Sequence, residues 1–164
     1  MRLGWLEPIV ISESKTYEIP LSCDNPVVYK IEDGFPEGEY LLIENRQPKK
    51  HDKKMPQGGL LVWHIDELAT IENEGYPGQD GWPQNGNHYK LALLQADGDY
   101  DLERGADYGD ASDVFHAGGV DSIGPAGTSK GKPFPNTNSY QGGNIRSTGI
   151  VISDISSSGD VMSF

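Results

Sequence analysis

The sequence predicts an all-β domain, in the form of a two-layer β-sandwich of about eight strands. Short runs of branched and aromatic residues recur along the chain, each bounded by Gly, Pro, Asn or Asp. No window carries the apolar periodicity of an amphipathic helix of useful length. The runs at 41–43, 60–63 and 91–94 are apolar on both faces, so we expect central strands that are covered on both sides.

The strands follow in order along the chain. We expect them at residues 9–11, 16–19, 26–31, 39–45, 59–66, 88–95, 149–155 and 161–164. The turn at 156–160 predicts that the last two form a hairpin. Asp66 is placed to cap one or two helical turns over 66–72. Trp63 lies in a central strand and is assigned to the core.

Length and charge exclude several classes of protein. The 164 residues fit one domain, residues 1–164, that can bury a core without disulfides, and Cys23 has no partner for one. A net charge of −12 argues against nucleic-acid binding and against a polybasic membrane contact. No apolar run is long enough to span a membrane, and no signal peptide opens the chain. Because Gly4, Trp5 and Leu6 are unusual opening residues, we expect a fragment of a larger protein with Met1 added.

Residues 97–147 lack any convincing strand or helix, and a loop this long indicates either function or a wrong assignment. Its first half, residues 97–121, contains eight acidic residues and one arginine, a net charge of −7. Its second half, residues 122–147, is rich in Gly, Pro, Ser and Asn. Neither half buries much apolar surface, so something else must order this segment.

The acidic half has the composition of a calcium-binding loop. Calcium takes six to eight oxygen ligands in flexible geometry, and interleaved glycines allow a tight loop to aim several carboxylates at one centre. The spacing does not match an EF-hand, because Leu102 and Tyr108 occupy its glycine and bidentate glutamate positions. The alternative is a solvated acidic loop. The predicted metal ligands are Asp97, Asp99, Asp101, Asp107, Asp110 and Asp113.

Other chemical motifs are absent or weak. The four histidines form no HExxH zinc motif, and no nucleophile elbow or phosphate-binding loop is present. His64 and Asp66 share one face of a strand, where a hydrogen-bonded histidine is favoured over a metal ligand or a base. Tyr76 and Trp82 lie in a turn-rich loop and are candidates for binding a sugar or a partner. The alternative is that Trp82 pins its own loop.

Several motifs in fixed order resemble one family of enzymes. They are GWLxP (4–8), EYLLIENR (39–46), GLLVWHIDE (59–67), LQADG (94–98), GDxxDxF (109–115), PNTNSY (135–140) and IxxIS (152–156). Together they are similar to the portion that follows the catalytic helices in secreted bacterial zinc metallopeptidases of the immune inhibitor A type, peptidase family M-six. The zinc-binding HExxH segment of that family is absent, so no catalytic residue carries over.

The resemblance implies a non-catalytic C-terminal portion of a secreted, extracellular enzyme, in which zinc belongs only to the absent catalytic portion. Its partners would be the catalytic domain of the same parent chain and the parent's protein substrate, with no nucleic acid and no membrane span. The function expected is that of a calcium-stabilised supporting β domain beside this catalytic domain, with no catalysis by the fragment alone. Two alternatives are a free-standing calcium-dependent module that binds carbohydrate or a cell surface, and a hydrolase that uses the loop carboxylates.

Overall fold

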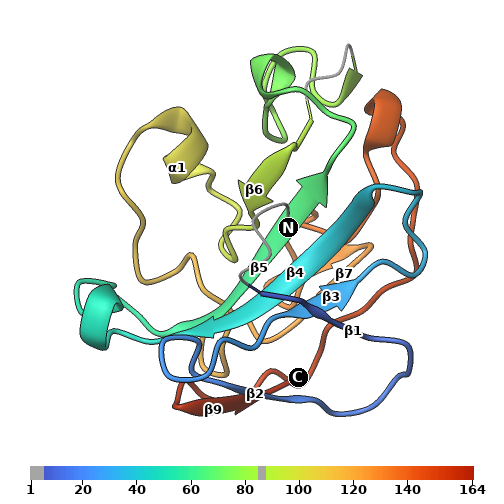
Figure 1. The fold of residues 1–164 in the computed structure, drawn as a ribbon. Helices are drawn as coiled ribbons and strands as arrows, with labels where there is room; N and C mark the ends of the chain where they lie inside the picture. The colour runs from blue at the N-terminus through green and yellow to red at the C-terminus, as the bar shows by residue number, and fades with distance from the viewer. Residues whose placement is uncertain (1–5, 85–87) are drawn as a thin grey trace.

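The fold is all-β and is built around a sheet of five strands (Figure 1). The computed structural model describes residues 6–84 and 88–164, so Gly4 and Trp5 of the first motif lie outside the described residues. The strands lie in the order β1-β3-β4-β5-β6. Their bounds are β1 Ile9–Val10, β3 Tyr29–Ile31, β4 Glu39–Arg46, β5 Gly59–Asp66 and β6 Leu91–Leu93.

The two long strands, β4 and β5, form the centre of this sheet and confirm the two strongest strand predictions. They pair antiparallel along their whole length, with Leu41 opposite His64 and Ile43 opposite Val62. These four side chains are buried on the inner face. Alternation along a strand sends Tyr40, Leu42 and Trp63 to the other face, where they belong to a second, smaller apolar cluster. Both faces of the central strands are therefore apolar, as the sequence predicts.

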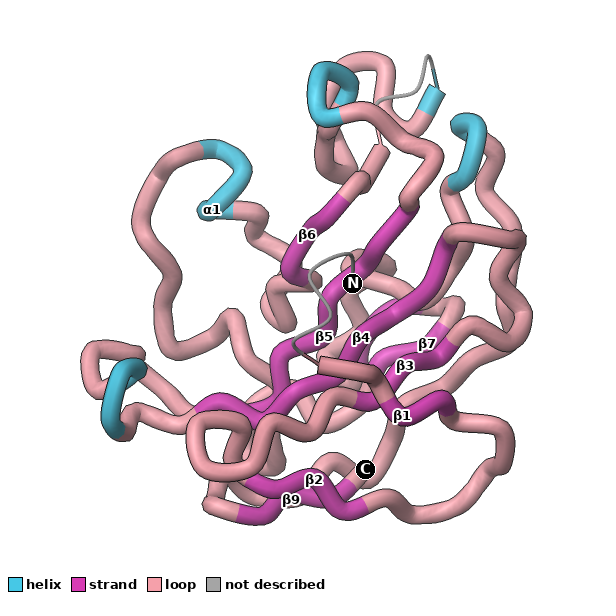
Figure 2. Tube along the Cα trace, viewed as in Figure 1, coloured by secondary structure: helices cyan, strands magenta, loops and turns pink. Residues whose placement is uncertain are grey.

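The layer that covers the inner face contains little regular structure (Figure 2). Its strands are β2 Glu18–Pro20 with β9 Val161–Ser163, and the hairpin of β7 Ile123–Gly124 with β8 Gly127–Thr128. The rest of this layer is loop. In the described residues the one α-helix, α1 Asp101–Arg104, lies between β6 and β7, and a 3-10 turn at Gln141–Gly143 lies between β8 and β9. Two further 3-10 turns, Lys50–Asp52 and Ile71–Asn73, join strands of the large sheet. Phe115, Ile123, Tyr140, Ile152 and Met162 of this layer pack with the sheet in one core. The segment 97–147 thus contains short elements that its composition did not predict.

Three strand predictions are wrong. The run at 149–155 is no strand, since within it only Ile152 forms an isolated bridge, to Ile123. The run at 91–94 is no central strand: β6 is an edge of the sheet, and the Leu91 side chain is 59% exposed. The reason is that Gln95 and Ala96 leave the sheet to anchor the acidic loop, which supplies no further strand. The final hairpin is also wrong, because Ile152 bridges Ile123 while β9 pairs with β2.

No helix in the two described stretches of chain has the length and hydropathy needed to cross a membrane. Cys23 is a free, half-buried thiol.

Candidate functional site

The acidic loop is closed at its base by the sheet. The Ala96 N–H donates to the Asp113 carbonyl over 3.0 Å. Two residues later, the fully buried Phe115 exchanges both backbone hydrogen bonds with Leu60 of β5, at 2.9 and 3.0 Å. This anchoring places Asp97 and Asp113, which are far apart in the loop, beside each other.

The structure brings five of the six predicted ligands together in two overlapping groups. One group is Asp97, Asp110 and Asp113, and the other is Asp101, Asp107 and Asp110. Within each group, one carboxylate oxygen from every residue lies within 4.8 Å of the others. Asp110 belongs to both groups. The spacing suits a hard cation that is bound by oxygen atoms.

Asp99 is the sixth predicted ligand, and the structure places it elsewhere. Its Oδ1 accepts an ion-paired hydrogen bond from Lys132 Nζ at 2.6 Å, and it belongs to neither group. Asp101 is also paired, with Arg104 one helical turn away, but its carboxylate remains in the second group. The alternating pattern predicted that all six aspartates bind the metal equally. In the structure Asp99 instead pairs with Lys132, from the second half of the loop.

Hydrogen bonds to backbone N–H groups fix the orientation of the remaining carboxylates. Asp97 Oδ1 accepts from the Asp99 N–H at 3.0 Å, and Asp107 Oδ1 accepts from the Gly109 N–H at 2.8 Å. Asp113 Oδ2 accepts from the Asp110 N–H at 2.7 Å, which joins the two members of the first group directly. These are the side-chain turns that aspartate forms readily in loops.

Asp113 is the buried member of the cluster, with 6% of its surface exposed. The pKa of its carboxyl is raised to about 6, mainly by burial and also by the negative charges of Asp97, Asp110 and Asp107, against the opposing hydrogen bond from the Asp110 N–H. Asp110 is exposed, and its hydrogen bonds from Ser112 lower its pKa. The loop therefore holds one carboxylate in a site where its negative charge is unfavourable unless a cation compensates for it.

This raised pKa predicts an unusual pH dependence in the presence of a chelator. The native Asp113 binds a proton more tightly than the unfolded one, so the stabilisation is complete below pH 4 and is lost as the pH rises through about 6. With screening by the exposed neighbours, we expect a loss of about 1–2 kcal/mol. Urea unfolding at several pH values measures this loss of unfolding free energy. In Asp113→Asn the free energy of unfolding should no longer fall between about pH 4 and pH 6 for this reason. An equal pH dependence of stability in wild type and Asp113→Asn would contradict the raised pKa of Asp113.

Gln95 is a site residue that the sequence analysis missed. Its fully buried side chain accepts a hydrogen bond from the Asp101 N–H at 2.8 Å and donates to Glu103, which fixes α1 beside the sheet. Burial raises the pKa of Glu103. The only sequence signal for this role is that Gln95 is a polar residue directly after the apolar run at 91–94.

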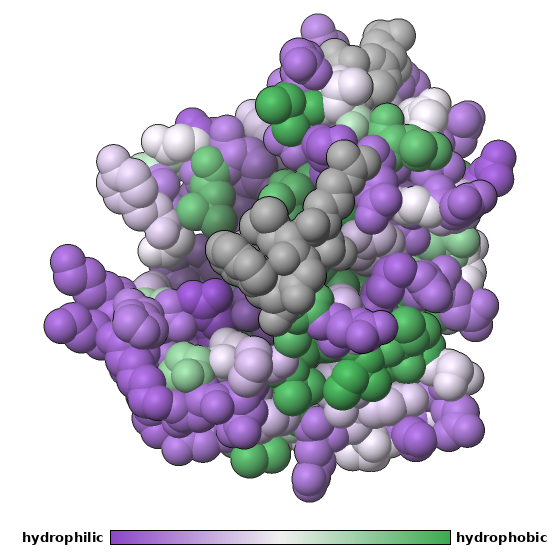
Figure 3. Space-filling view, in the orientation of Figure 1, coloured by the Kyte–Doolittle hydropathy of each residue, from purple (hydrophilic) through white to green (hydrophobic). Residues whose placement is uncertain are grey.

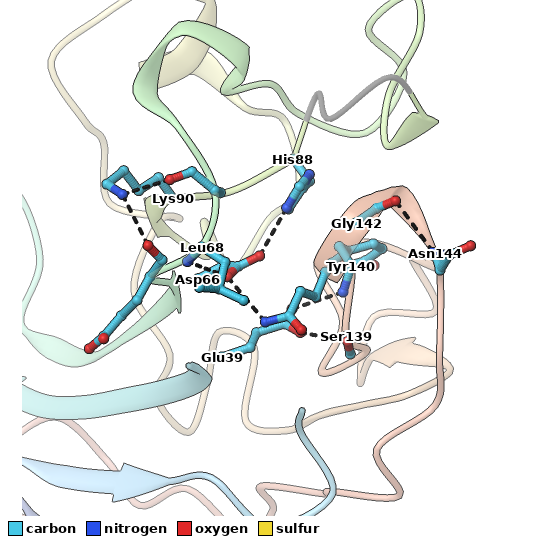
Figure 4. Close-up of polar contacts among 12 residues, drawn as sticks. Glu39, Asp66, Leu68, His88, Lys90, Ser139, Tyr140, Gly142 and Asn144 are labelled. Carbon is cyan, nitrogen blue, oxygen red and sulfur yellow. Dashed lines mark hydrogen bonds and ion pairs between the residues drawn. The ribbon is translucent and has the colours of Figure 1, made fainter. Parts of the chain in front are cut away.

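A second polar cluster lies on the inner face of the sheet and fastens the other half of the long loop (Figure 4). Glu39 Oε1 accepts from His64 Nε2 at 2.7 Å and from the Tyr140 N–H at 2.8 Å, and Oε2 accepts from Ser139 Oγ at 2.5 Å. Beside it, Asp66 Oδ2 accepts from His88 Nε2 at 2.9 Å. His64 is thus a hydrogen-bonded strand histidine, as the sequence favoured.

Asp66 does not cap a helix as expected, because the N-cap of the nearest helical turn is Thr70 and Asp66 holds only the tight turn after β5. Its Oδ1 accepts from the Leu68 N–H at 2.9 Å, and the helical turn that follows is the short 3-10 helix Ile71–Asn73. Burial is the largest single influence on the Asp66 carboxyl and raises its pKa, but the hydrogen bonds from His88, Leu68 and Gln141 together outweigh burial and leave this pKa below its usual value.

The two predicted partner-binding aromatics contact other aromatic rings of the chain. Trp82 packs against Tyr140, with ring centres 4.7 Å apart, and against Phe134 and Tyr89. Tyr76 stacks on Tyr100 at 5.8 Å. Both rings are half-buried. Trp82 therefore helps to hold residues 134–140 against the sheet, and a role of Tyr76 and Trp82 in binding a sugar or a partner stays a prediction.

Comparison of the chain with known protein families, with curated proteins and with solved structures found no match.

Proposed function

We propose that this chain is a calcium-stabilised supporting β domain. The observation that carries the proposal is the buried carboxylate of Asp113, which lies with Asp97 and Asp110 where three negative charges repel one another. A bound cation would offset this repulsion, which the buried Tyr100, Val114 and Phe115 of the same segment cannot do. Calcium fits better than magnesium, because magnesium demands near-octahedral geometry and gives up its water reluctantly.

We further propose that the domain packs beside the catalytic domain of a secreted zinc metallopeptidase of the immune inhibitor A type. The support is the ordered series of motifs. Three of them supply the residues of the cluster at the inner face of the sheet: EYLLIENR contributes Glu39, GLLVWHIDE contributes His64 and Asp66, and PNTNSY contributes Ser139 and Tyr140. Zinc and the protein substrate would belong to the parent enzyme. The binding-module alternative relied on Tyr76 and Trp82, and the Trp82 ring packs against Tyr140, Phe134 and Tyr89.

A thermal melt tests the calcium proposal. A ligand that binds only the folded state at a hundredfold excess over Kd stabilises it by about 2.7 kcal/mol. For a domain of this size we therefore expect millimolar calcium to raise Tm by roughly 5–10 °C relative to chelator. Magnesium should give a smaller rise. Asp113→Asn should raise Tm in chelator, because it removes a buried charge, and should abolish the response to calcium. Superimposed curves for wild type in calcium and in chelator would refute the proposal.

A further inference from the structure

The open edge of β6 offers unpaired backbone groups. Antiparallel pairing with β5 is hydrogen-bonded at Lys90 and Leu94, through the Asp66 N–H and the Val62 carbonyl at 3.0 and 2.8 Å. In an antiparallel pair, the backbone groups of successive residues point alternately toward the partner strand and away from it. The N–H and C=O groups of Leu91 and Leu93 therefore point away from β5. Glu74 Oε1 accepts from the Leu91 N–H at 2.9 Å, and in the described part of the chain nothing accepts from the Leu93 N–H. Such an edge is a template for another strand.

A groove of about 450 Å³ runs along this edge, between β6 and α1. The space-filling view is hollowed beside α1 (Figure 3). Apolar surface comes from Trp63, Tyr76, Leu91 and Leu102, and the two acidic residues of the lining are Glu74 and Glu103. The groove therefore combines backbone hydrogen-bonding groups, apolar contact area and negative charge.

Among the residues that the structure describes, no basic side chain of the neighbouring elements pairs with Glu74 or Glu103. Lys90, next to β6, donates from its ammonium to the carbonyls of Ala69 and Glu67, at 2.6 and 3.4 Å. Arg104 of α1 pairs with Asp101. A second copy of the chain that paired edge to edge would bring Glu74 and Glu103 against their own counterparts, and each copy has a net charge of −12. Repulsion thus disfavours self-pairing and favours a basic occupant.

We propose that the groove beside β6 binds an extended segment of a partner protein that alternates apolar and basic residues. The segment adds a strand to β6 through the Leu93 N–H and the Leu91 and Leu93 carbonyls, while Glu74 keeps the Leu91 N–H. It places apolar side chains against Leu91 and Trp63, and basic side chains near Glu74 and Glu103. Backbone hydrogen bonds give affinity and the side-chain contacts give selectivity. This inference does not rest on calcium binding or on the metallopeptidase assignment.

Fluorescence anisotropy with a labelled Val-Lys-Val-Lys-Val-Lys peptide tests the proposal, in calcium and in chelator. We expect saturable binding in at least one of these buffers, weakened by salt and absent for the Val-Glu-Val-Glu-Val-Glu peptide. The double variant Glu74→Gln/Glu103→Gln keeps the hydrogen-bond acceptors and should bind about tenfold more weakly, while Glu7→Gln, at an exposed glutamate outside the groove, should bind as wild type does.

Amide hydrogen exchange of the folded protein gives a second readout. Strand addition should slow exchange at the Leu93 N–H and leave the Val10 N–H, at the opposite edge of the sheet, unchanged. Four results would overturn the proposal: no saturable binding in either buffer, equal binding of the acidic peptide, an unprotected Leu93 amide in the complex, or a protein dimer that protects this amide without peptide.

Discussion

Replacement of Glu39 by alanine is expected to lower the free energy of unfolding by about 3–5 kcal/mol, the cost of breaking a buried charged network. Only 1% of the Glu39 surface is exposed, and its carboxylate accepts hydrogen bonds from His64, Ser139 and Tyr140. Alanine leaves all three donors buried without an acceptor, and each unsatisfied group carries a penalty. The loss also detaches residues 139–140 from the sheet.

Urea unfolding of wild type and Glu39→Ala measures this effect, and Glu37→Ala is the matched control. Glu37 is exposed and lies two residues earlier, in the turn before β4, so its removal should change stability by less than about 0.5 kcal/mol. Equal stabilities of the two variants would show that the Glu39 network contributes little.

Substitution of Gly98 by alanine is expected to cost about 2–4 kcal/mol, from backbone strain together with overpacking. Gly98 has φ +70°, and a Cβ there would lie 2.3 Å from the Phe134 carbonyl oxygen. Because this contact is with backbone, the two halves of the long loop would have to separate. The change would also displace the neighbouring Asp97, so the response of Tm to calcium should shrink.

Gly105→Ala separates the cost of backbone strain from the cost of overpacking. Gly105 has a similar φ of +63°, but a Cβ there meets nothing within 4 Å. Its substitution should therefore cost only the strain of the left-handed conformation, about 1 kcal/mol. Urea unfolding of both variants decides the point. A loss for Gly98→Ala no greater than that for Gly105→Ala would contradict the close approach to Phe134.

Local pattern was enough to predict the centre of the fold but not its edges. Residues 59–66 form the strand that their composition predicts, because an apolar run bounded by turn residues has few other ways to be buried. The run at 91–94 has the same composition and lies at an edge. Its place depends on Gln95, which hydrogen-bonds the nearby α1, and on Phe115, which pairs with Leu60 of β5 from a distant part of the chain. Such long-range contacts leave no periodic signal.

For the candidate site too, the sequence predicted the loop but not the role of each residue in it. The density of aspartates identified the loop, and five of the six residues come together. Composition could not separate Asp99, which faces Lys132, from Asp113, whose burial follows from its place just before the core residue Phe115. Nor did it reveal Glu39, which becomes important only when residues 139–140 fold onto the sheet.

Isothermal titration of chelator-treated protein with calcium tests the central claim most directly. Wild type should bind calcium saturably. Asp99→Asn should keep this binding, because Asp99 is paired with Lys132 outside both carboxylate groups, whereas Asp113→Asn should lose it. Both variants remove one negative charge, so net charge alone cannot explain a difference. Absence of binding by wild type, or equal binding by the two variants, would contradict the account.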